Sequence, residues 1–111
     1  MTFDQSSFLE CFKEAILTSN DGTKRWYSNG KLHREDGPAV VTNSGTTKWY
    51  RNGVLHREDG PAIEYYDGSK NWYRDGNLHR DDGPAVEFAD GTREWFIDGF
   101  RHREGVRLHS L

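Results

Sequence analysis

A chain of 111 residues, 33% of them hydrophobic, accommodates one small domain with a limited core and argues against a second domain. The formal net charge of -3, without a clustered basic excess, argues against a long nucleic acid as a partner. The single Cys11 excludes an internal disulfide, and without a Cys/His zinc spacing we expect a cytoplasmic protein that holds no metal or cofactor.

Residues 1–20 are predicted to form an amphipathic helix. Their apolar side chains recur with helical spacing, at Phe8, Leu9, Phe12, Ala15 and Ile16. Ser7 followed by Glu10 makes a capping box, and the Asn-Asp-Gly segment 20–22 ends the helix. Charged residues interrupt the apolar part, which argues against a signal peptide and a membrane span. We expect this helix to pack on a sheet formed by the rest of the chain.

Four repeats of nearly equal length are predicted over residues 21–111, with boundaries at 21–43, 44–66, 67–89 and 90–111. Each repeat has a Trp in the same position, namely Trp26, Trp49, Trp72 and Trp95. A Gly follows four residues later, at Gly30, Gly53, Gly76 and Gly99. The first three repeats share Asp-Gly-Pro-Ala, with Pro38, Pro61 and Pro84. The fourth lacks this motif, as a degenerate capping repeat does.

Each repeat is predicted to contain two antiparallel strands. Segments such as 46–51 (TTKWYR) and 62–66 (AIEYY) are rich in β-branched and aromatic residues. Asn-Gly or Asp-Gly follows every Trp strand and predicts a type I′ turn, at 29–30, 52–53, 75–76 and 98–99. A second turn is expected at 43–45, 67–68 and 90–91. Two reversals per repeat return the chain to the same direction, so equivalent residues occupy equivalent positions.

The motif His-Arg-acid-Asp-Gly-Pro is predicted to form a corner. Pro61 lacks the N–H that a strand ladder needs, and Gly60 tolerates unusual φ values. Residues 54–57 are expected to pair back onto the Trp strand, and residues 62–66 forward onto the next Trp strand. Because repeated corners bend a sheet, the predicted fold is mainly β. It is a curved antiparallel β-meander of about four stacked hairpin repeats, an open sheet or solenoid-like, with one N-terminal α-helix.

Both faces of this sheet are predicted to be aromatic. Trp49 and Tyr50 are adjacent, so their side chains point to opposite sides. Val40, Ile63 and Val86 share one side with Thr42, Tyr65 and Phe88, which we take as the core side, whereas Ala39, Ala62 and Ala85 lie on the other. An open sheet with two exposed aromatic faces favours association. Beyond the helix, we therefore expect a protein partner, or a homodimer through the exposed aromatic face.

The repeat resembles the MORN repeat class. The shared features are Asn-Gly-Lys-x-His at 29–33, an aromatic pair before it and an Asp-Gly turn after it. Over residues 21–111 this resemblance implies a curved sheet of stacked hairpins used for protein or lipid contacts. The longer string WYxNGxxHREDGPA is more similar to a divergent repeat of bacteriophage and bacterial proteins. That similarity implies a phage accessory protein that binds and inhibits a host defence protein in the host-cell cytoplasm.

The repeated His and acidic residues are not expected to be catalytic. His33, Glu35 and Asp36 have the chemistry of an acid/base pair or of metal ligands, but a motif copied in every repeat offers no single asymmetric site. A His beside Trp, an Arg stem across an aromatic ring and an Asp that accepts turn N–H bonds explain the same residues. The chain is therefore predicted not to be an enzyme.

The favoured function is a non-enzymatic protein-interaction module. Aromatic and Arg side chains are typical of binding hot spots. The candidate partner-binding residues are Tyr27, Tyr50, Arg51, Tyr73, Arg74 and Phe96. The alternative is a small-molecule or nucleotide-binding repeat protein, because aromatic rows interleaved with Arg stack bases. A third hypothesis makes residues 1–20 the docking element, held on a scaffold.

Overall fold

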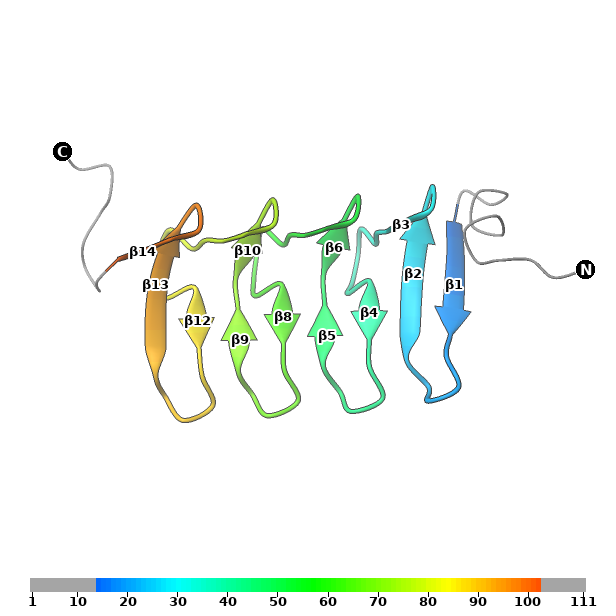
Figure 1. The fold of residues 1–111 in the computed structure, drawn as a ribbon, viewed down its shortest axis with the longest axis horizontal. Coiled ribbons are helices and arrows are strands. Elements are labelled where there is room, and N and C mark those ends of the chain that lie inside the picture. Colours follow the sequence, from blue (N-terminus) through cyan, green and yellow to red (C-terminus); the bar gives the residue numbers. More distant parts are fainter. Residues whose placement is uncertain (1–13, 103–111) are drawn as a thin grey trace, which may run out of the picture.

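The protein is an open, mainly β structure built from one repeated unit (Figure 1). The computed structural model describes residues 14–102. The strands in this range are β1 (Glu14–Thr18), β2 (Lys24–Ser28), β3 (Lys31–Leu32), β4 (Val40–Val41), β5 (Thr47–Lys48), β6 (Tyr50–Arg51), β7 (Val54–Leu55), β8 (Ile63–Glu64), β9 (Lys70–Asn71), β10 (Tyr73–Arg74), β11 (Asn77–Leu78), β12 (Val86–Glu87), β13 (Arg93–Ile97) and β14 (Phe100–His102). Residues 14–102 contain no helix.

Ten of these strands form one antiparallel sheet. Its order is β1-β2-β4-β5-β8-β9-β12-β13-β14, with β3 paired to β2 beside this path. The other strands form two separate hairpins, β6-β7 and β10-β11. The two ends of the sheet do not meet, so the predicted meander is an open sheet (Figure 1). The molecule is accordingly elongated, with extents of 59 × 30 × 21 Å.

Two successive residues with positive φ shape the turn after each Trp strand. They are Asn29-Gly30, Asn52-Gly53, Asp75-Gly76 and Asp98-Gly99, with φ of 50–51° at the first residue and 80–85° at the second. Two left-handed residues in succession are the mark of a type I′ turn, and Asn, Asp and Gly adopt this conformation at the least cost. The prediction of a hairpin at this place is confirmed.

A second turn reverses the chain at the opposite end of the strands. Thr42 N–H donates to Thr46 O at 2.9 Å, and Gly45 N–H donates to Thr42 O at 3.1 Å. The same pair of bonds recurs at 19–23, 65–69 and 88–92. This turn therefore also keeps the period of the repeat, as predicted, and its first copy begins before the first predicted repeat boundary.

An aspartate stabilises three of these second turns. Oδ1 of Asp21, Asp67 and Asp90 accepts the backbone N–H two residues later at 2.9 Å. Because this bond favours the ionised carboxylate, it lowers the pKa of Asp21 and of Asp90 below the usual value. These aspartates belong to the second turns and not to the His-Arg-acid-Asp motif, where the bond from a turn N–H was expected. In that motif Asp59 and Asp82 instead accept from an Arg Nε at 3.2 Å.

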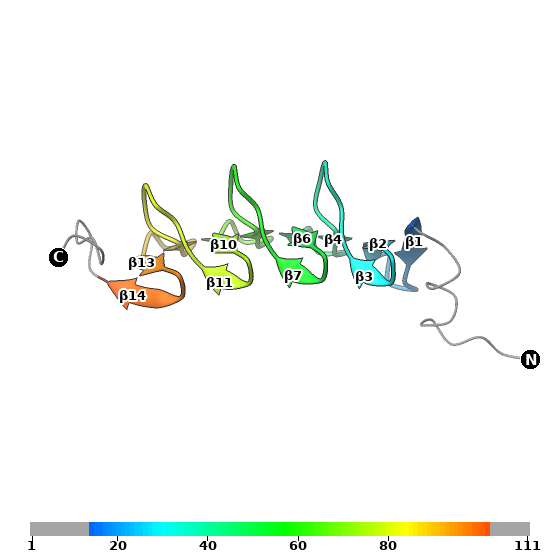
Figure 2. The same ribbon diagram turned by 90° about the horizontal axis from the view of Figure 1, so that it is seen from above.

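In the inner repeats, the segment that contains Trp pairs in the main sheet before the Trp and in a separate hairpin after it. β5 ends and β6 begins on either side of Trp49. β5 pairs with β4 and β8 in the main sheet, whereas β6 pairs with β7. Seen from above, the hairpins lie on one side of the sheet and the corner motifs project on the other (Figure 2). The two strands predicted per repeat are therefore four short ones, because the hydrogen-bonding partners change at Trp49.

The pairings predicted around the corner motif are confirmed. β7 pairs back onto β6, and β8 pairs forward onto β9 of the next repeat. β8 also pairs with β5 of its own repeat. Each repeat is thus hydrogen-bonded both internally and to its neighbour.

The buried core is thin and follows the repeat period. The buried hydrophobic residues are Ala39, Val40, Ala62, Ile63, Ala85 and Val86. The burial of the Val and Ile residues agrees with the expected core side, whereas Tyr65 and Phe88, expected on the same side, are exposed. Ala39 is fully buried although it was assigned to the other side. Its backbone carbonyl accepts Trp26 N–H at 2.8 Å, which places Ala39 opposite Trp26 beyond the end of the β2-β4 pairing.

The segment predicted as an amphipathic helix ends in a strand. In β1, Ile16 lies opposite Trp26 and Ala15 opposite Tyr27 of β2. The helix prediction is therefore wrong for residues 14–18, and its remainder, residues 1–13, lies outside the described residues. Burial alternates along β1, which is the period of a strand, and pairing with β2 engages its backbone over five residues. The C-terminal part of the predicted capping repeat, residues 103–111, also lies outside the described residues.

Candidate functional site

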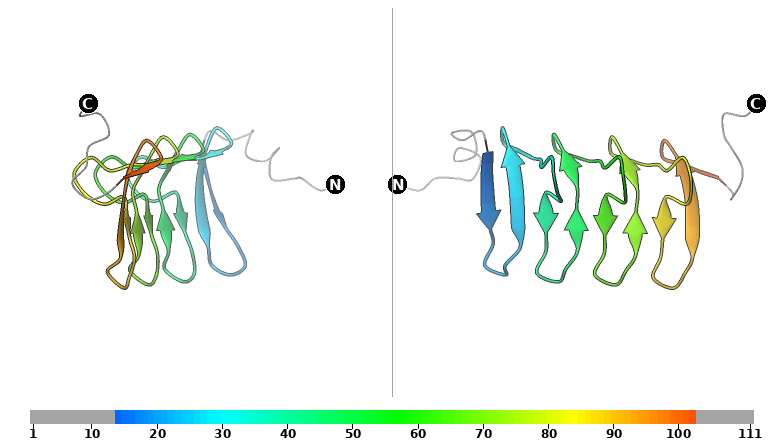
Figure 3. Two further views of the ribbon diagram at one scale, coloured as in Figure 1. Left: turned by 60° about the vertical axis from the view of Figure 1, so that its left-hand side comes forward. Right: turned by 180° about the vertical axis from the view of Figure 1, so that it is seen from behind.

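Three equivalent loops project from one side of the sheet. They comprise residues 33–38, 56–61 and 79–84 and are called the corner loops (Figure 2). Each leads from a hairpin strand, β3, β7 or β11, to the next strand of the main sheet. Figure 3 shows the corner loops and the hairpins together at one end of the sheet strands. Because the repeats lie side by side, the corner loops form a row along the molecule.

Each corner loop places an Arg over the Trp of its own repeat. The distance from Cζ to the ring centroid is 4.0 Å for Arg34 and Trp26, 3.9 Å for Arg57 and Trp49, and 4.0 Å for Arg80 and Trp72. A cation over an indole at this distance is attracted by the ring quadrupole. The expectation of Arg packed across an aromatic ring is confirmed for these three residues.

A glycine makes room for this Arg. A Cβ added to Gly60 would lie 2.9 Å from Cζ of Arg57, and Gly37 and Gly83 show the same approach at 3.0 and 2.9 Å. None of these three glycines has a positive φ. The suggestion that Gly60 serves an unusual backbone conformation is therefore wrong. The glycine instead lets the guanidinium pack closely against its backbone.

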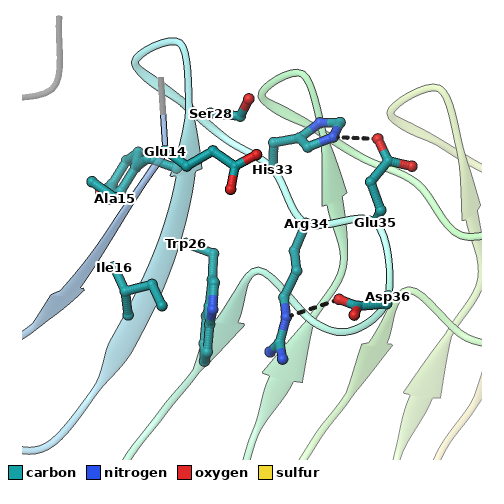
Figure 4. Close-up of a pocket in the computed structure, with 10 residues that line it drawn as sticks. Glu14, Ala15, Ile16, Trp26, Ser28, His33, Arg34, Glu35 and Asp36 are labelled. Carbon is teal, nitrogen blue, oxygen red and sulfur yellow. Dashed lines mark hydrogen bonds and ion pairs between the residues drawn. The ribbon is translucent and has the colours of Figure 1, made fainter. Parts of the chain in front are cut away.

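The same guanidinium closes its loop by hydrogen bonds. Arg57 Nη1 donates to Pro61 O at 3.1 Å, and Nε donates to Asp59 Oδ1 at 3.2 Å. Arg34 likewise contacts Asp36, as Figure 4 shows. These bonds tie both ends of the loop to one side chain, which itself rests on the Trp ring.

Two of the three Arg residues also bind the sheet. Arg57 Nη1 lies 3.3 Å from Glu64 Oε2, and Arg80 Nη1 lies 3.2 Å from Glu87 Oε2. The first repeat has Val41 at this position. The second and third loops are therefore attached more firmly to the sheet than the first.

The His of each corner loop connects its repeat to the next one. Nδ1 accepts the backbone N–H of the following Asn-Gly or Asp-Gly turn, from Asn52 to His33 at 3.0 Å, from Asp75 to His56 at 2.9 Å and from Asp98 to His79 at 2.9 Å. Nε2 lies near a carboxylate of its own loop, 2.7 Å from Glu35 in the first repeat (Figure 4). Since Nδ1 accepts, a neutral ring has its proton on Nε2, which donates to that carboxylate.

Backbone bonds complete this junction between repeats. Gly53 N–H donates to Leu32 O at 2.8 Å, and Arg34 N–H donates to Tyr50 O at 3.3 Å. Both recur at the next two junctions. Neighbouring corner loops are thus held in a fixed relation by one side chain and two backbone bonds.

The acidic side chains of the corner loops face solvent. Their exposed fractions are 75% for Glu35, 89% for Asp36, 68% for Glu58, 86% for Asp59, 64% for Asp81 and 87% for Asp82. The stacked Arg side chains are only 20–30% exposed. His56 and then Arg51 lower the pKa of Glu58, which keeps this carboxylate ionised. The loop row therefore presents mainly negative charge.

A groove adjoins each corner loop. The groove between the first two loops measures about 440 Å³, and the one between the second and third about 540 Å³. A third, of about 770 Å³, lies between β1 and the first loop (Figure 4). Five of the six predicted partner-binding residues line these grooves: Tyr27, Tyr50, Arg51, Tyr73 and Arg74.

The sixth predicted residue, Phe96, lines none of these three grooves. Its backbone carbonyl accepts Arg80 N–H at 3.1 Å, as Tyr50 and Tyr73 do at the earlier junctions. Arg51 and Arg74 are about half exposed, and each lies 3.4 Å from a loop carboxylate, Glu58 or Asp81. The structure thus brings the predicted Tyr and Arg residues together with the acidic residues of the loops.

The site holds no arrangement that stands apart from the repeat. Both ring nitrogens of the three corner-loop His residues are engaged, and Nε2 of His79 also lies 3.2 Å from Arg74 Nη1. Within residues 14–102, no group of three or more His, Cys, Asp and Glu side chains is placed to hold a metal ion. Over the same range, no helix has the length and apolarity needed to cross a membrane.

Two features of the site escaped the sequence analysis. The hydrogen bond from Asn52 N–H to His33 Nδ1 joins residues that are 19 positions apart, and no local sequence pattern predicts such a contact. The Arg to Glu pairs do have a signal, because Glu64 and Glu87 each follow the stacked Arg by seven residues.

Fold and site together define an open-sheet repeat protein with a row of braced, acidic loops. Comparison of the chain with protein-family models, with curated proteins and with solved structures gives no match. The resemblance to MORN repeats stays a prediction from the repeated motif.

Proposed function

We propose that the protein is a non-enzymatic interaction module that binds another protein along its row of corner loops. The observation that carries the proposal is one outward-facing loop, built three times with the same internal bracing. The Arg and Trp stack holds each loop from within, and the His bond holds it to its neighbour. A surface that is already ordered loses little conformational entropy on binding.

The exposed charge favours a cationic partner. Six loop carboxylates are 64–89% exposed. The Arg residues stacked on Trp are 20–30% exposed, and the other two Arg residues of the grooves between loops, Arg51 and Arg74, are 46% and 45% exposed and already face carboxylates. Charge complementarity accelerates association and fixes the register of a bound chain. We therefore propose that the partner presents Lys or Arg side chains to the grooves.

The spacing of the loops favours an extended partner segment. Successive loops are two strands apart, about 9.6 Å at about 4.8 Å per strand. A polyproline II segment advances about 9.3 Å in three residues, so a cation at every third residue meets each groove in turn. Tyr50 and Tyr73, which line the two grooves between loops, offer apolar surface to the intervening residues.

Catalysis and nucleotide binding receive less support. Engagement of both nitrogens of His56 leaves that ring poorly placed to act as a general base. For a nucleotide, Arg57 already covers one face of the Trp49 ring, and the exposed carboxylates nearby repel phosphate. No observation favours either alternative over a protein partner.

The natural partner that the motif resemblance suggests is a host protein. We propose that a phage-encoded copy binds and inhibits a host defence factor through the loop row. Bacteria that express the protein and are challenged with a phage test this. Phage growth should improve with the wild type but not with a variant that lacks the loop carboxylates. Equal phage growth with and without the protein would contradict this origin while leaving the binding surface open to test.

The binding surface is tested with synthetic peptides. Fluorescence anisotropy should detect a peptide with Lys or Arg at every third residue, and binding should weaken as salt rises. Peptides of the same composition with cations at every second or fourth residue should bind at least tenfold less tightly. Equal affinity for all three spacings would show non-specific charge attraction and reject the register argument.

A matched pair of variants locates the contact. The triple variant Glu35→Gln, Glu58→Gln, Asp81→Asn removes three negative charges from the corner loops. The control Asp67→Asn, Asp90→Asn, Glu94→Gln removes three charges that line none of the three grooves. Affinity should fall in the loop variant and hold in the control. A similar loss in both would mean that net charge alone drives binding.

A further inference from the structure

Two Asn-Gly turns with the same backbone differ in their hydrogen bonds. Asn29-Gly30 and Asn52-Gly53 both have φ near 51° at Asn and above 79° at Gly, and both are exposed. At the second turn, Asn52 N–H donates to His33 Nδ1 and Gly53 N–H donates to Leu32 O. In the described part of the chain neither backbone N–H of the first turn has such an acceptor, because β1 rather than another repeat precedes it.

The Asn-Gly sequence supports an intramolecular reaction. The backbone nitrogen of Gly attacks Cγ of the preceding Asn, a new N–Cγ bond forms, and ammonia leaves. Water then opens the resulting succinimide at either carbonyl and yields aspartate or isoaspartate. One water is consumed and one ammonia released, with no oxidant or reductant. Glycine permits the attack because it has no Cβ to obstruct the nitrogen.

We propose that Asn29 is a site of spontaneous deamidation, and that the junction between repeats protects Asn52 from the same reaction. The turn must open for the Gly nitrogen to reach Cγ. At Asn52 this opening breaks two hydrogen bonds that Asn29 and Gly30 do not make. Two bonds of ordinary strength lower the open population roughly 30-fold. Because both sites are Asn-Gly, the sequence alone predicts similar deamidation rates for them. The stacking of repeats makes the rates differ.

The aspartate product fits the turn. Asp75 and Asp98 occupy the equivalent position in the third and fourth repeats with φ of 51° and 50°. Deamidation to aspartate therefore adds one negative charge at the first repeat without changing the turn type. Isoaspartate instead lengthens the main chain by one methylene and disrupts the type I′ geometry. This inference is independent of the proposed function.

Peptide mapping by mass spectrometry tests the proposal. The purified 111-residue chain is held at about pH 8 and about 37 °C, and the 1 Da mass gain is followed at both sites. Deamidation at Asn29 should run at least tenfold faster than at Asn52. In urea the two rates should converge, because unfolding removes the protecting bonds. Equal rates in the folded protein, or a faster Asn52, would overturn the proposal.

A variant at His33 tests whether the junction between repeats protects Asn52 from deamidation. His33→Ala removes one of the two bonds and should raise the rate at Asn52 about fivefold, with Asn29 as the internal reference. A folded His33→Ala protein with an unchanged Asn52 rate would reject protection by this His. If the variant is unfolded, deamidation at Asn29 and at Asn52 should reach the rates measured in urea. An Asn29 rate that is still tenfold above the Asn52 rate in the unfolded chain would show an effect of local sequence and overturn the proposal.

Discussion

Arg57 lies over the indole of Trp49 with Cζ 3.9 Å from the ring centroid, and a Cβ on Gly60 would come within 2.9 Å of the same atom. Trp, Arg and Gly of one repeat are therefore a single packing unit. Their spacing is the same in each of the first three repeats because the removal of any one disturbs the contacts of the other two. The unit also explains how a thin sheet supports a projecting loop.

Replacement of Gly60 by Ala is predicted to displace Arg57 from Trp49. The new Cβ meets the far end of a flexible side chain, so the guanidinium moves and the stack weakens. We expect the free energy of unfolding in urea to fall by about 1 kcal/mol, the usual strength of a partly buried cation–π contact. In an Arg57→Ala background the same Gly60→Ala change should cost much less. An equal cost in both backgrounds would place the strain in the backbone instead.

Loss of His56 is predicted to uncouple two repeats. His56→Ala removes the acceptor for Asp75 N–H and the contact with Glu58. We expect a loss of about 2 kcal/mol in urea unfolding, since two bonds at a mostly buried ring disappear. Glu58→Gln serves as the control, because an amide oxygen still accepts from Nε2, and its effect should be much smaller than that of His56→Ala. A larger effect of Glu58→Gln than of His56→Ala would contradict the junction role.

Acid is predicted to weaken the second turns. The backbone N–H of Thr92 lowers the pKa of Asp90 below 3.8, and that of Thr23 lowers the pKa of Asp21. A depressed carboxyl pKa contributes stability above the unfolded value, and this contribution is lost as pH falls below about 4. Urea midpoints measured between about pH 5 and about pH 3 should fall less steeply for Asp21→Asn/Asp90→Asn than for the wild type. Identical slopes would contradict a role for these two carboxylates.

Alkaline titration is predicted to reveal Tyr65. Partial loss of hydration, and then the neighbouring Tyr73 and Asp67, raise the pKa of Tyr65 above 10.0. A raised tyrosine pKa contributes stability that is present below the unfolded value and lost as pH rises through the folded one. The ultraviolet titration should therefore include a tyrosinate that forms above pH 10 and is lost in Tyr65→Phe, and Tyr73→Phe should lower the pH at which it forms. A titration of Tyr65 at or below pH 10 would reject this environment.

Turn chemistry was the most reliable guide to this fold. Asn29-Gly30 and its equivalents determine two left-handed residues through local sterics alone, so their turns follow from the sequence. The pairing of β7 with β6 follows from the same turn. The helix prediction failed at Ala15 and Ile16 because five residues of mixed polarity fit a helical pattern and a strand pattern equally well. Pairing with β2 stabilises the strand.

The candidate site was predicted only in part from the sequence. Tyr50, Arg51, Tyr73 and Arg74 were selected as an aromatic and basic surface, and they do line two grooves. The outward charge of those grooves is acidic, however, because Arg57 and its equivalents turn inward onto Trp. The sequence shows which residues are charged but not which of them are exposed. Only the exposed charges are available to a partner.

By itself, the sequence determined the repeat length, the two turns and the alternation that buries Val40, Ile63 and Val86, since these depend on residues close together in the chain. Only the tertiary structure decided where His33 Nδ1 finds its donor, which Gly makes room for an Arg, and which of two identical Asn-Gly turns is protected. Each of these depends on backbone or side chains brought close by folding, and the junctions join residues of adjacent repeats. Sequence spacing does not specify such distances until the sheet has formed.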